Sequence, residues 1–364
     1  MSLLTVIGNR PQMIKMAPVS TEIAARGLTE YIVHTNQHYD HAMSGVFFEQ
    51  LGIPAPSRFL TIDGRSHARM TAEMMVQLED LMLEQSPRGV LVYGDTNSTL
   101  AAVLAAAKLN IPLAHVEAGP RTGDMTMPEE VNRIPADHLS RLRFCTDAVS
   151  VENLKREGIE AGVFLTGDLM YDAFVKFRPT AAVSDTLALH TKKFAGKPFV
   201  FMTIHRPANT DTADAMGRLY DLIAQSPLPI LFAVHPRTAA AMEKFGLKEQ
   251  FEKLPHLAMT PPLAYFDTMA ALLQCTFTVT DSGGLQKESY WAGRKSFLAQ
   301  DISPWPQLTA DGWVTCIGAF DKPLRPDLWN TMQAHEPQVP FKPYFGDGQA
   351  ARKIVDALES HGFF

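Results

Sequence analysis

The chain has 364 residues, of which 46% are hydrophobic and 20% are charged, and its formal net charge is -6. Because single hydrophobic cores usually stop growing at about 250 to 300 residues, two domains are expected. The acidic balance, with no basic stripe, argues against nucleic-acid binding and against attachment to an anionic membrane. No apolar run reaches the roughly 18 residues that span a bilayer. We therefore expect no nucleic-acid partner and no membrane partner.

The three cysteines, Cys145, Cys275 and Cys316, are widely separated and lie in or near apolar runs. This placement is typical of buried thiols rather than of a disulfide framework or a metal site. The N-terminal residues show no basic leader, so the chain is expected to begin with the first strand of a folded domain. Both observations favour a cytoplasmic protein in a reducing compartment.

Strand-like apolar runs alternate with helical patterns along the whole chain. The first series comprises residues 3–7, 31–34, 90–93, 113–116, 143–145 and 163–165. The second comprises residues 199–204, 230–234, 257–259, 277–279, 296–298 and 314–317. Strands that alternate with helices predict a parallel, doubly wound sheet, and two series predict two such sheets.

The boundary between the two sheets is expected near residues 170 to 195, where proline and glycine interrupt a helical pattern. We predict an N-terminal domain at 1–172 and a C-terminal domain at 173–364. The simplest α/β assembly has two Rossmann-like domains facing an interdomain cleft. The helical segment from about 348 to 360 could pack back on the first domain.

Three acids follow strand-like runs in the first half of the chain. Asp95 comes after residues 90–93, Glu117 comes after residues 113–116, and Glu129 lies in the polar segment beyond. Because the carboxyl ends of parallel strands open into the ligand crevice, Asp95 and Glu117 would lie side by side there. These acids predict a reacting centre. The alternative is that Asp95 only caps the following helix and Glu117 is a loop charge.

Two loops have features of phosphate-binding segments. After the first strand, Gly8 permits a tight turn and Arg10 offers a bidentate donor to phosphate at a helix start. In the second half, Ser282, Gly283 and Gly284 can present a hydroxyl and backbone amides to a diphosphate, and Glu288 could accept hydrogen bonds from ribose hydroxyls. Neither loop is a GxGxxG or Walker sequence, so nicotinamide and ATP phosphoryl chemistry have no support.

Two histidines repeat the pattern of charge just past a strand. His205 follows residues 199–204, and His235 follows residues 230–234. A single histidine at such a place is more often structural. Two histidines at corresponding strand ends of one sheet favour roles in a site.

Taken together, these segments resemble the non-hydrolysing UDP-N-acetylglucosamine 2-epimerase family along nearly the whole chain. The matching segments are GNRPQMIKMAPV, TNQHYD, GDTNSTLA, HVEAGPRTGD, MPEEVNR, TGDLMYD, TIHRPAN, VHPRT and DSGGLQKES. Three of these segments, GDTNSTLA, MPEEVNR and DSGGLQKES, look especially like the branch that acts on UDP-2,3-diacetamido-2,3-dideoxyglucuronate. The resemblance implies a two-domain GT-B fold, a UDP-sugar substrate, a homodimer, and no metal or nicotinamide cofactor.

The resemblance also implies the roles of individual residues. The family inverts carbon 2 of the sugar by eliminating UDP to give a 2-acetamidoglucal and adding UDP back, with the proton returned to the opposite face of carbon 2. By this comparison Asp95 and Glu117 transfer protons at carbon 2, Glu129 transfers a proton or positions a sugar hydroxyl, and His205 serves the diphosphate side. Which acid serves which face stays open. The residues placed around UDP are Arg10, Lys15, Arg133, His235, Ser282, Gly283, Gly284 and Glu288.

The chain departs from the family pattern at several positions. Ala208 stands at a position that is usually glutamate, Pro120 replaces a usual leucine, and Lys287 replaces a frequent acid. The segment 300–307, QDISPWPQ, lacks an arginine or acid that the family carries near the sugar. Ser44 stands where bacterial relatives carry a glutamine of an allosteric site. These changes put the sugar specificity and the regulation in doubt.

Two other classes of function fit the same fold. A retaining glycosyltransferase would bind a UDP-sugar but turn over only with an acceptor, and it would need no proton transfer at carbon 2. A sugar-nucleotide sensor would bind UDP without turnover. The acids at 95, 117 and 129 favour the epimerase. The resemblance implies that such an enzyme makes a precursor of a cell-surface polysaccharide.

Overall fold

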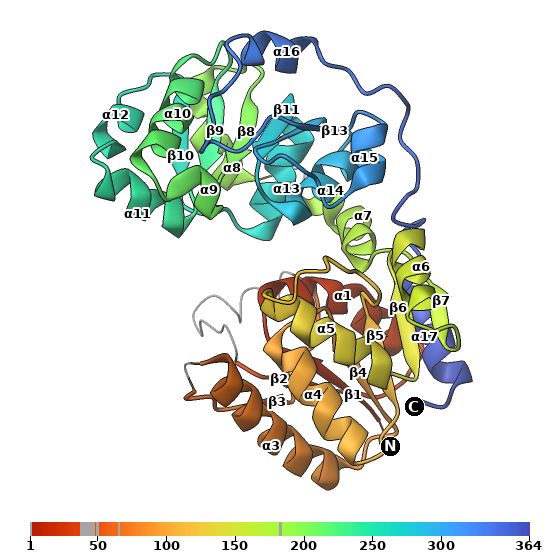
Figure 1. Ribbon diagram of the computed structural model, residues 1–364. Helices are drawn as coiled ribbons and strands as arrows, with labels where there is room; N and C mark the ends of the chain where they lie inside the picture. The colour runs from red at the N-terminus through yellow and green to blue at the C-terminus, as the bar shows by residue number, and fades with distance from the viewer. Residues whose placement is uncertain (1, 37–47, 49–50, 65, 182–183) are drawn as a thin grey trace. The chain divides into compact units, whose positions relative to one another are not determined.

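The computed structural model describes residues 2–36, 48, 51–64, 66–181 and 184–364, and it divides the chain into two compact units (Figure 1). Unit 1 comprises Met1–Val175 and Pro343–Phe364, and unit 2 comprises Lys176–Lys342. The first crossing lies close to the predicted position, after residue 172. The second domain, however, ends at residue 342 and not at 364, because the C-terminal segment belongs to unit 1.

The reason for this return is visible in the contacts of the last helix, α17 (Ala350–Ser360). It packs against α1 (Arg10–Ala25), and Arg26 at the end of α1 pairs with Asp356 at 2.7 Å and with Glu359 at 2.5 Å. Beyond the helix, the Phe363 ring is buried, and it fills the space where a side chain at Gly89 would project.

Unit 1 contains a parallel sheet in the order β3-β2-β1-β4-β5-β6-β7. Its strands are β1 (Leu3–Ile7), β2 (Glu30–His34), β3 (Arg58–Phe59), β4 (Gly89–Tyr93), β5 (Leu113–Val116), β6 (Leu142–Cys145) and β7 (Val163–Leu165). Within the described part of unit 1, only the two-residue β3 was not predicted. It is too short to leave a periodic apolar signal.

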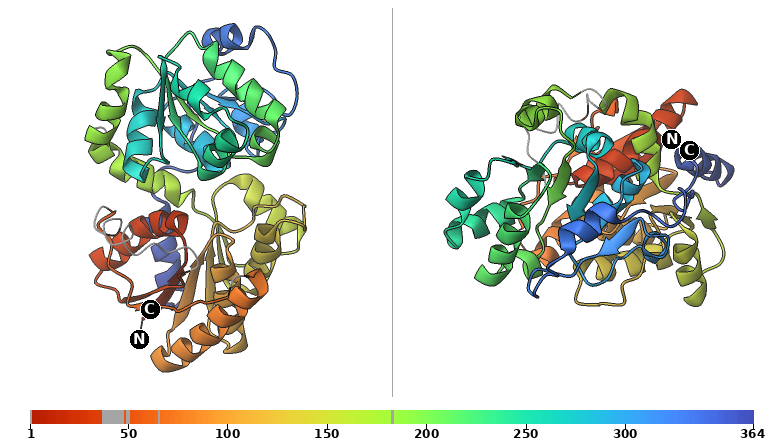
Figure 2. Two further views of the ribbon diagram at one scale, coloured as in Figure 1. Left: turned by 90° about the vertical axis from the view of Figure 1, so that its left-hand side faces the viewer. Right: turned by 90° about the horizontal axis from the view of Figure 1, so that it is seen from above.

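Helices cover both faces of this sheet (Figure 2). Apolar side chains of α3 (His67–Gln85), α4 (Asn97–Lys108) and α5 (Pro128–Leu139) share one buried cluster with β1, β2, β4 and β5. The alanine-rich face of α4 allows close approach to the sheet. The remaining helices are α6 (Ala148–Arg156) and α7 (Leu169–Ala181), and α7 carries the chain from unit 1 into unit 2.

Unit 2 contains a second parallel sheet in the order β10-β9-β8-β11-β12-β13. Its strands are β8 (Val200–Thr203), β9 (Ile230–Ala233), β10 (Leu257–Thr260), β11 (Phe277–Thr280), β12 (Ser296–Leu298) and β13 (Val314–Cys316). Each agrees with a predicted run to within one or two residues. Parallel strands that are buried on both faces appear in the sequence as short continuous apolar runs, which is why the sequence predicts these strands.

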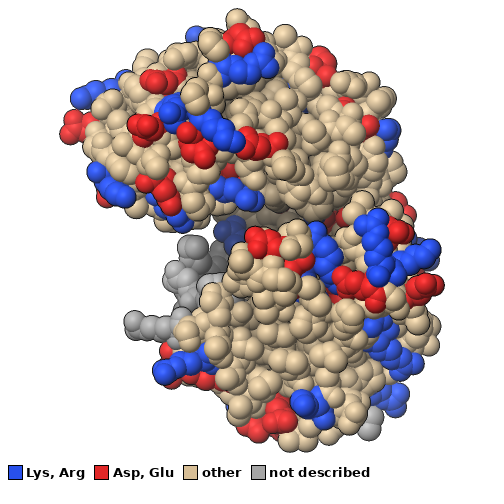
Figure 3. Space-filling model, viewed as in Figure 1, with Lys and Arg blue, Asp and Glu red and all other residues tan. Residues whose placement is uncertain are grey.

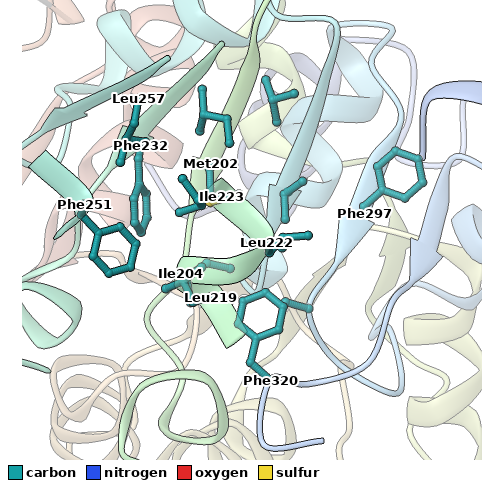
Figure 4. Close-up of a cluster of buried hydrophobic side chains, with 14 of the residues drawn as sticks. Met202, Ile204, Leu219, Leu222, Ile223, Phe232, Phe251, Leu257, Phe297 and Phe320 are labelled. Atoms are coloured by element: carbon teal, nitrogen blue, oxygen red, sulfur yellow. The ribbon is translucent and has the colours of Figure 1, made fainter. Parts of the chain in front are cut away.

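Two buried clusters lie on opposite faces of the second sheet. One joins α10 (Ala213–Ala224), α11 (Pro236–Lys244), α12 (Lys248–Glu252) and α16 (Leu328–Ala334) to the sheet, and Figure 4 shows its side chains, among them Met202, Phe232 and Phe251. The other joins α8 (Asp185–Thr191), η1 (Lys192–Phe194), α13 (Tyr265–Gln274) and α14 (Gly283–Trp291). The remaining helices are α9 (Pro207–Thr210) and α15 (Pro306–Ala310).

The two sheets share a feature that places the site. In unit 1 the strand order reverses between β1 and β4, and in unit 2 it reverses between β8 and β11. At such a point the loops after the two strands leave in opposite directions, so a crevice opens at the carboxyl ends of the strands.

In the described residues no helix is long and apolar enough to cross a membrane. On the face shown in Figure 3, acidic and basic side chains are intermixed over both units.

Candidate active site

The turn after β1 is fixed by Gln12, a buried residue in the first turn of α1. The amide of Gly8 donates to Gln12 Oε1 at 2.7 Å, and Gln12 Nε2 donates to the carbonyl of Tyr93 at 2.6 Å. Gln12 therefore ties the β1 turn to the end of β4 across the reversal point. Arg10, the first residue of α1, is half-buried beside this junction.

Glu117 lies directly after β5 and forms an ion pair with Lys15 of α1. Burial lowers the pKa of Lys15, but the attraction of Glu117 outweighs it, so the net pKa is raised and Lys15 is a cation. Glu117 has a left-handed backbone with φ of 67°, which costs an L-residue with a Cβ atom about 1 kcal/mol or more. Its amide donates to the carbonyl of Phe144 at 3.0 Å, which helps to hold this conformation.

Asp95, after β4, forms an ion pair with Arg133 of α5. It does not cap the following helix, because the cap position of α4 belongs to Thr96. Burial raises the pKa of Asp95, Arg133 opposes this rise, and the neighbouring Glu117 carboxylate adds to it; the net pKa is raised. A carboxyl of this kind can carry a proton closer to neutral pH than an ordinary aspartate.

The two acids are brought together at Gly94. A Cβ atom at this glycine would lie 3.4 Å from Oε2 of Glu117 and 3.8 Å from Nζ of Lys15. The next residue in the chain is Asp95. The predicted juxtaposition of Asp95 and Glu117 at neighbouring strand ends is therefore present, and each acid has its own cation.

Glu129 and Glu130 occupy different environments in the first turn of α5. Glu129 is exposed, whereas Glu130 is 1% exposed. The Glu130 carboxylate accepts hydrogen bonds from the amides of Thr122 and Gly123 at 3.0–3.2 Å and pairs with Arg133 at 3.2 Å.

The sequence reasoning missed Glu130, although the segment MPEEVNR contains a usable signal. A carboxylate at the third position of a helix that begins at proline commonly reaches back to amides of the preceding loop. Asn132 in the same segment donates to the carbonyl of Asp95 at 2.9 Å. This segment thus positions the turn that carries Asp95.

In unit 2, His205 follows β8 and Asp281 follows β11. The Asp281 carboxylate is fully buried and accepts from His205 Nδ1 at 2.8 Å, from the amides of His205 and Arg206 at 2.8–3.0 Å, and from Asn209 Nδ2 at 2.8 Å. Burial raises the pKa of Asp281, but these donors outweigh it and hold the net pKa below its ordinary value. Asp281 therefore orients His205 as an ionised carboxylate.

His235 lies at the start of α11, where its Nδ1 accepts the amide of Arg237 at 3.2 Å. Its ring is 5.1 Å from the ring of His205, centroid to centroid. Burial, followed by the neighbouring His205, lowers the pKa of His235. The two histidines predicted at corresponding strand ends are thus adjacent side chains.

The segment after β11 forms the N-terminus of α14. The Ser282 hydroxyl caps this helix by accepting the amide of Leu285 at 3.4 Å, which leaves its own proton for donation. Cβ atoms at Gly283 and Gly284 would meet at most one atom of the protein within 4 Å. Packing against the rest of the protein therefore does not require glycine at these two positions. Glu288, half-buried, lies one turn further along the helix.

The segment 300–307, which departs from the family pattern, contacts this same helix start. Gln300 Nε2 donates to the carbonyl of Asp281 at 2.6 Å, and Trp305 Nε1 donates to the carbonyl of Gly283 at 2.8 Å. Lys287, a second departure, places its Nζ 4.4 Å from the centroid of the Trp305 ring. Ala208 is exposed in α9. Ser44 lies outside the described residues.

The cysteines agree with the sequence interpretation in part. Cys145 and Cys275 are buried thiols, and Cys316 is half-buried; all three are free. Burial raises the pKa of Cys145 and of Cys275 to about 12, so these thiols are not nucleophiles at neutral pH. In the part of the chain that the structure describes, no three histidine, cysteine or acidic side chains form a candidate metal site.

Comparison with known proteins identifies relatives of this chain. The family model for UDP-N-acetylglucosamine 2-epimerase matches residues 21–359. The chain is 38% identical over 369 residues to UDP-2,3-diacetamido-2,3-dideoxy-D-glucuronate 2-epimerase of Pseudomonas aeruginosa, covering 98% of this chain and 99% of the relative. It is 37% identical over 360 residues to a UDP-N-acetylglucosamine 2-epimerase homologue of Methanococcus maripaludis, covering 99% and 100%.

Solved structures give the same result. The crystal structure of Methanocaldococcus jannaschii UDP-GlcNAc 2-epimerase in complex with UDP-GlcNAc and UDP matches with a TM-score of 0.86 at 30% identity, covering 99% of this chain and 100% of that one. The fold class predicted from the sequence, α/β of the GT-B type with two Rossmann-like domains, is confirmed. The chain belongs to the UDP-N-acetylglucosamine 2-epimerase family.

Proposed function

We propose that this protein catalyses the reversible epimerisation at carbon 2 of a UDP-N-acetylhexosamine by elimination and readdition of UDP. The substrate is UDP-N-acetylglucosamine or its 2,3-diacetamido-uronate analogue. The observation that carries the proposal is the pair of strand-end acids, Asp95 and Glu117, each held by its own cation. Neither a glycosyltransferase nor a sensor needs two acids arranged for proton transfer.

The chemistry requires a base, an acid and a stabilised leaving group. In the first half-reaction a carboxylate takes the proton from carbon 2, the electrons of that C–H bond form the C1–C2 double bond, and the C1–O bond breaks to release UDP. In the second half-reaction a carboxyl returns a proton to the opposite face of carbon 2 while a UDP oxygen bonds to carbon 1. The raised pKa of Asp95 favours it as a proton carrier in the resting enzyme.

Lys15 and Arg133 have a defined part in this scheme. Each of the two strand-end acids is paired with one of these cations, which stabilises the acid when it is ionised. Protonation of either acid weakens its ion pair and frees cationic charge for the developing anion. Glu129, exposed in the first turn of α5, is proposed to transfer a proton or to position a sugar hydroxyl.

Unit 2 is proposed to hold UDP. With Nδ1 of His205 bonded to Asp281, Nε2 is the nitrogen left for the departing diphosphate. The amides at Gly283 and Gly284, together with the Ser282 hydroxyl, form an anion-binding helix start. Glu288 is proposed to accept hydrogen bonds from the ribose, while Arg10 and His235 complete the contacts with UDP.

The wider context follows from the same proposal. The product would be a precursor for a cell-surface polysaccharide, made in the cytoplasm by a homodimer without cofactor. Relatives of both sugar classes match at nearly equal identity, so the sugar must be assigned by assay. The contacts of Trp305 and Lys287 at the start of α14 mark the segment that differs from the family and that should decide the sugar accepted.

The direct test is isotope exchange at carbon 2. The protein is incubated in heavy water with UDP-N-acetylglucosamine and, separately, with the diacetamido-uronate nucleotide, and the carbon-2 proton is followed by NMR. We expect loss of the proton signal and appearance of the epimer with one of the two. Turnover only after addition of an acceptor would indicate a glycosyltransferase. A higher melting temperature with UDP but no exchange with either sugar would indicate a sensor.

A further inference from the structure

A buried ion pair lies directly behind the two strand-end acids, and the scheme above does not use it. His115, in β5, and Asp137, in α5, are both 0% exposed. Nδ1 of His115 is 2.7 Å from Oδ1 of Asp137, and Nε2 of His115 is 2.8 Å from the carbonyl oxygen of Gly94. Both ring nitrogens are thus within hydrogen-bond distance of an oxygen.

The two partners decide the protonation state of the imidazole. A carbonyl oxygen can only accept a hydrogen bond, and an ionised carboxylate can only accept as well. The Asp137 carboxylate also receives Arg121 Nη1 at 2.7 Å and the Gly119 amide at 3.1 Å, which are both donors. Burial raises the pKa of Asp137, but His115 and Arg121 outweigh it and leave the net pKa lowered. Each nitrogen of His115 must therefore carry a proton.

This pair connects the two turns that carry the acids. Gly94, whose carbonyl accepts from His115, immediately precedes Asp95 and has a left-handed φ of 60°. Gly119, whose amide donates to Asp137, lies two residues after Glu117 and has a φ of 90°. Both turns have unusual backbone conformations, and one ion pair holds them from behind.

We propose that His115 is a positioning residue that donates from both ring nitrogens and that, with Asp137, it sets the relative placement of Asp95 and Glu117. This inference rests on the proposed function, because the relative placement of Asp95 and Glu117 matters for catalysis only if both acids act on one substrate. A neutral imidazole would leave either the Gly94 carbonyl or the Asp137 carboxylate facing a bare ring nitrogen. The turn at Gly94 would then lose its fixed point, and Asp95 would move relative to Glu117.

Three charged groups complete the surroundings of the pair. Arg121 is shared between Asp137 and Glu157, at 2.7 Å and 2.6 Å. Arg143 donates through Nε to the backbone carbonyl of Asp137 at 2.5 Å. The carboxylate of Asp137 thus faces His115 and Arg121, while Arg143 holds its backbone.

The protonation state can be measured on the unmodified protein. We expect NMR of the protein labelled with nitrogen-15 in histidine to show directly bonded protons on both ring nitrogens of His115 in the folded protein at neutral pH. The signal is assigned by its absence from the His115→Gln spectrum or, if that variant does not fold, by its displacement in Asp137→Asn. One unprotonated ring nitrogen at that pH would overturn the proposal. This result does not depend on whether any sugar nucleotide turns over.

The positioning role is tested with His115→Gln and Asp137→Asn, each compared with His138→Gln. His138 is the neighbouring half-exposed histidine and pairs with Glu157 at 3.2 Å. Because small displacements of reacting groups cost about 100-fold, kcat per folded molecule should fall by that factor in both test variants, while KM and UDP affinity stay within a few-fold of the unmodified protein. A lower melting temperature with unchanged kcat would show a merely structural role. Absence of exchange in the unmodified protein would contradict the proposed function instead.

Discussion

The two units use one backbone design for two kinds of chemistry. In each, a parallel sheet reverses its strand order beside the first strand, and the side chains of interest follow strands at the reversal or next to it. In unit 1 these side chains are carboxylates paired with Lys15 and Arg133. In unit 2 they are two histidines, and the one carboxylate, Asp281, is consumed by four donor groups of the protein.

The difference concerns where a proton can go. Asp95 in unit 1 is half-buried and has a raised pKa, so it can exchange a proton with a substrate. Asp281 in unit 2 is fully buried and has a lowered pKa, so it stays ionised and orients donors toward a ligand. In the proposed scheme the same fold position thus supplies proton transfer in one unit and anion binding in the other.

The largest effect that this comparison predicts is in Asp95→Asn. The carboxamide keeps the shape but cannot take up a proton, so carbon-2 exchange should fall by about 100- to 10,000-fold. Arg133 keeps Glu130 as a partner, and the fold should therefore survive. Exchange in heavy water and UDP binding by calorimetry are the measurements. Asp124→Asn, an exposed aspartate near the start of α5, is the matched control and should exchange normally. Loss of UDP binding in Asp95→Asn would break the division of labour between the units.

The corresponding change in unit 2, Asp281→Asn, should act on stability. It removes the negative charge and replaces one acceptor oxygen with an NH2 group that faces the donors of His205, Arg206 and Asn209, at a cost of about 3–5 kcal/mol in the free energy of unfolding. Because the folded-state pKa of Asp281 is lowered, its contribution is present above the unfolded value of about 3.9 and is lost as the pH falls below it.

Chemical denaturation at neutral and acidic pH provides the measurement. The gap between Asp281→Asn and the unmodified protein should be widest at neutral pH and should close in acid. Asp301→Asn, which removes an exposed partner of Lys322, should cost less than about 1 kcal/mol. A gap that widened in acid would show that Asp281 is protonated in the folded state.

These contrasts explain which parts of the site could be predicted from the sequence. The strand ends at Asp95, Glu117, His205 and His235 were found because buried parallel strands leave short apolar runs with abrupt polar ends. The partners were not found, because Lys15 and Arg133 lie on helices far from the acids in sequence, and no periodicity records which charges meet. The resemblance named both as UDP contacts, but it did not indicate that each forms an ion pair with an acid.

For a similar reason the sequence only allowed the last helix to pack back on the first domain and did not assign it there. The helix α17 has the same amphipathic signal whether it packs on unit 1 or on unit 2. The packing of α17 on α1, which includes the contacts of Arg26 with Asp356 and Glu359, assigns it to unit 1. The buried support residues Gln12, Glu130 and His115 were also overlooked, because a single polar residue in an apolar run carries no sign of its partner.

His205→Gln should weaken UDP binding while leaving unit 2 folded. The amides of His205 and Arg206 still reach Asp281, so the loss is confined to the side chain. A hydrogen bond to a charged ligand is worth about 1.5–3 kcal/mol, and UDP affinity should therefore fall about tenfold or more. Calorimetric titration with UDP is the test. His190→Gln in α8 is the control and should bind normally. An unchanged affinity in His205→Gln would remove His205 from the diphosphate site.

Gly284→Ala separates ligand approach from folding. No atom of the described structure lies within 4 Å of a Cβ atom at Gly284 or at Gly217, which is also helical. Alanine in a helix is favoured over glycine by about 1 kcal/mol, so neither variant should lose stability. Only Gly284→Ala should weaken UDP binding, by about tenfold, since its methyl group occupies the proposed approach of the diphosphate. Equal UDP affinity in the two variants would place the diphosphate elsewhere.

The smallest expected effect concerns the backbone of Glu117 and comes from comparing Glu117→Gly with Glu117→Ala. Both variants remove the partner of Lys15 and should lose exchange activity to the same extent. They differ in how well they tolerate the φ of 67°. The left-handed conformation costs alanine about 1–2 kcal/mol, and the greater freedom of unfolded glycine offsets about 0.4–1 kcal/mol of this difference. The Glu117→Gly variant should therefore have a free energy of unfolding higher than that of Glu117→Ala by roughly 0.5–1 kcal/mol, measured by chemical denaturation. If alanine were the more stable, the turn would relax without the ion pair, and Lys15 would be the group that maintains the strained conformation at the site.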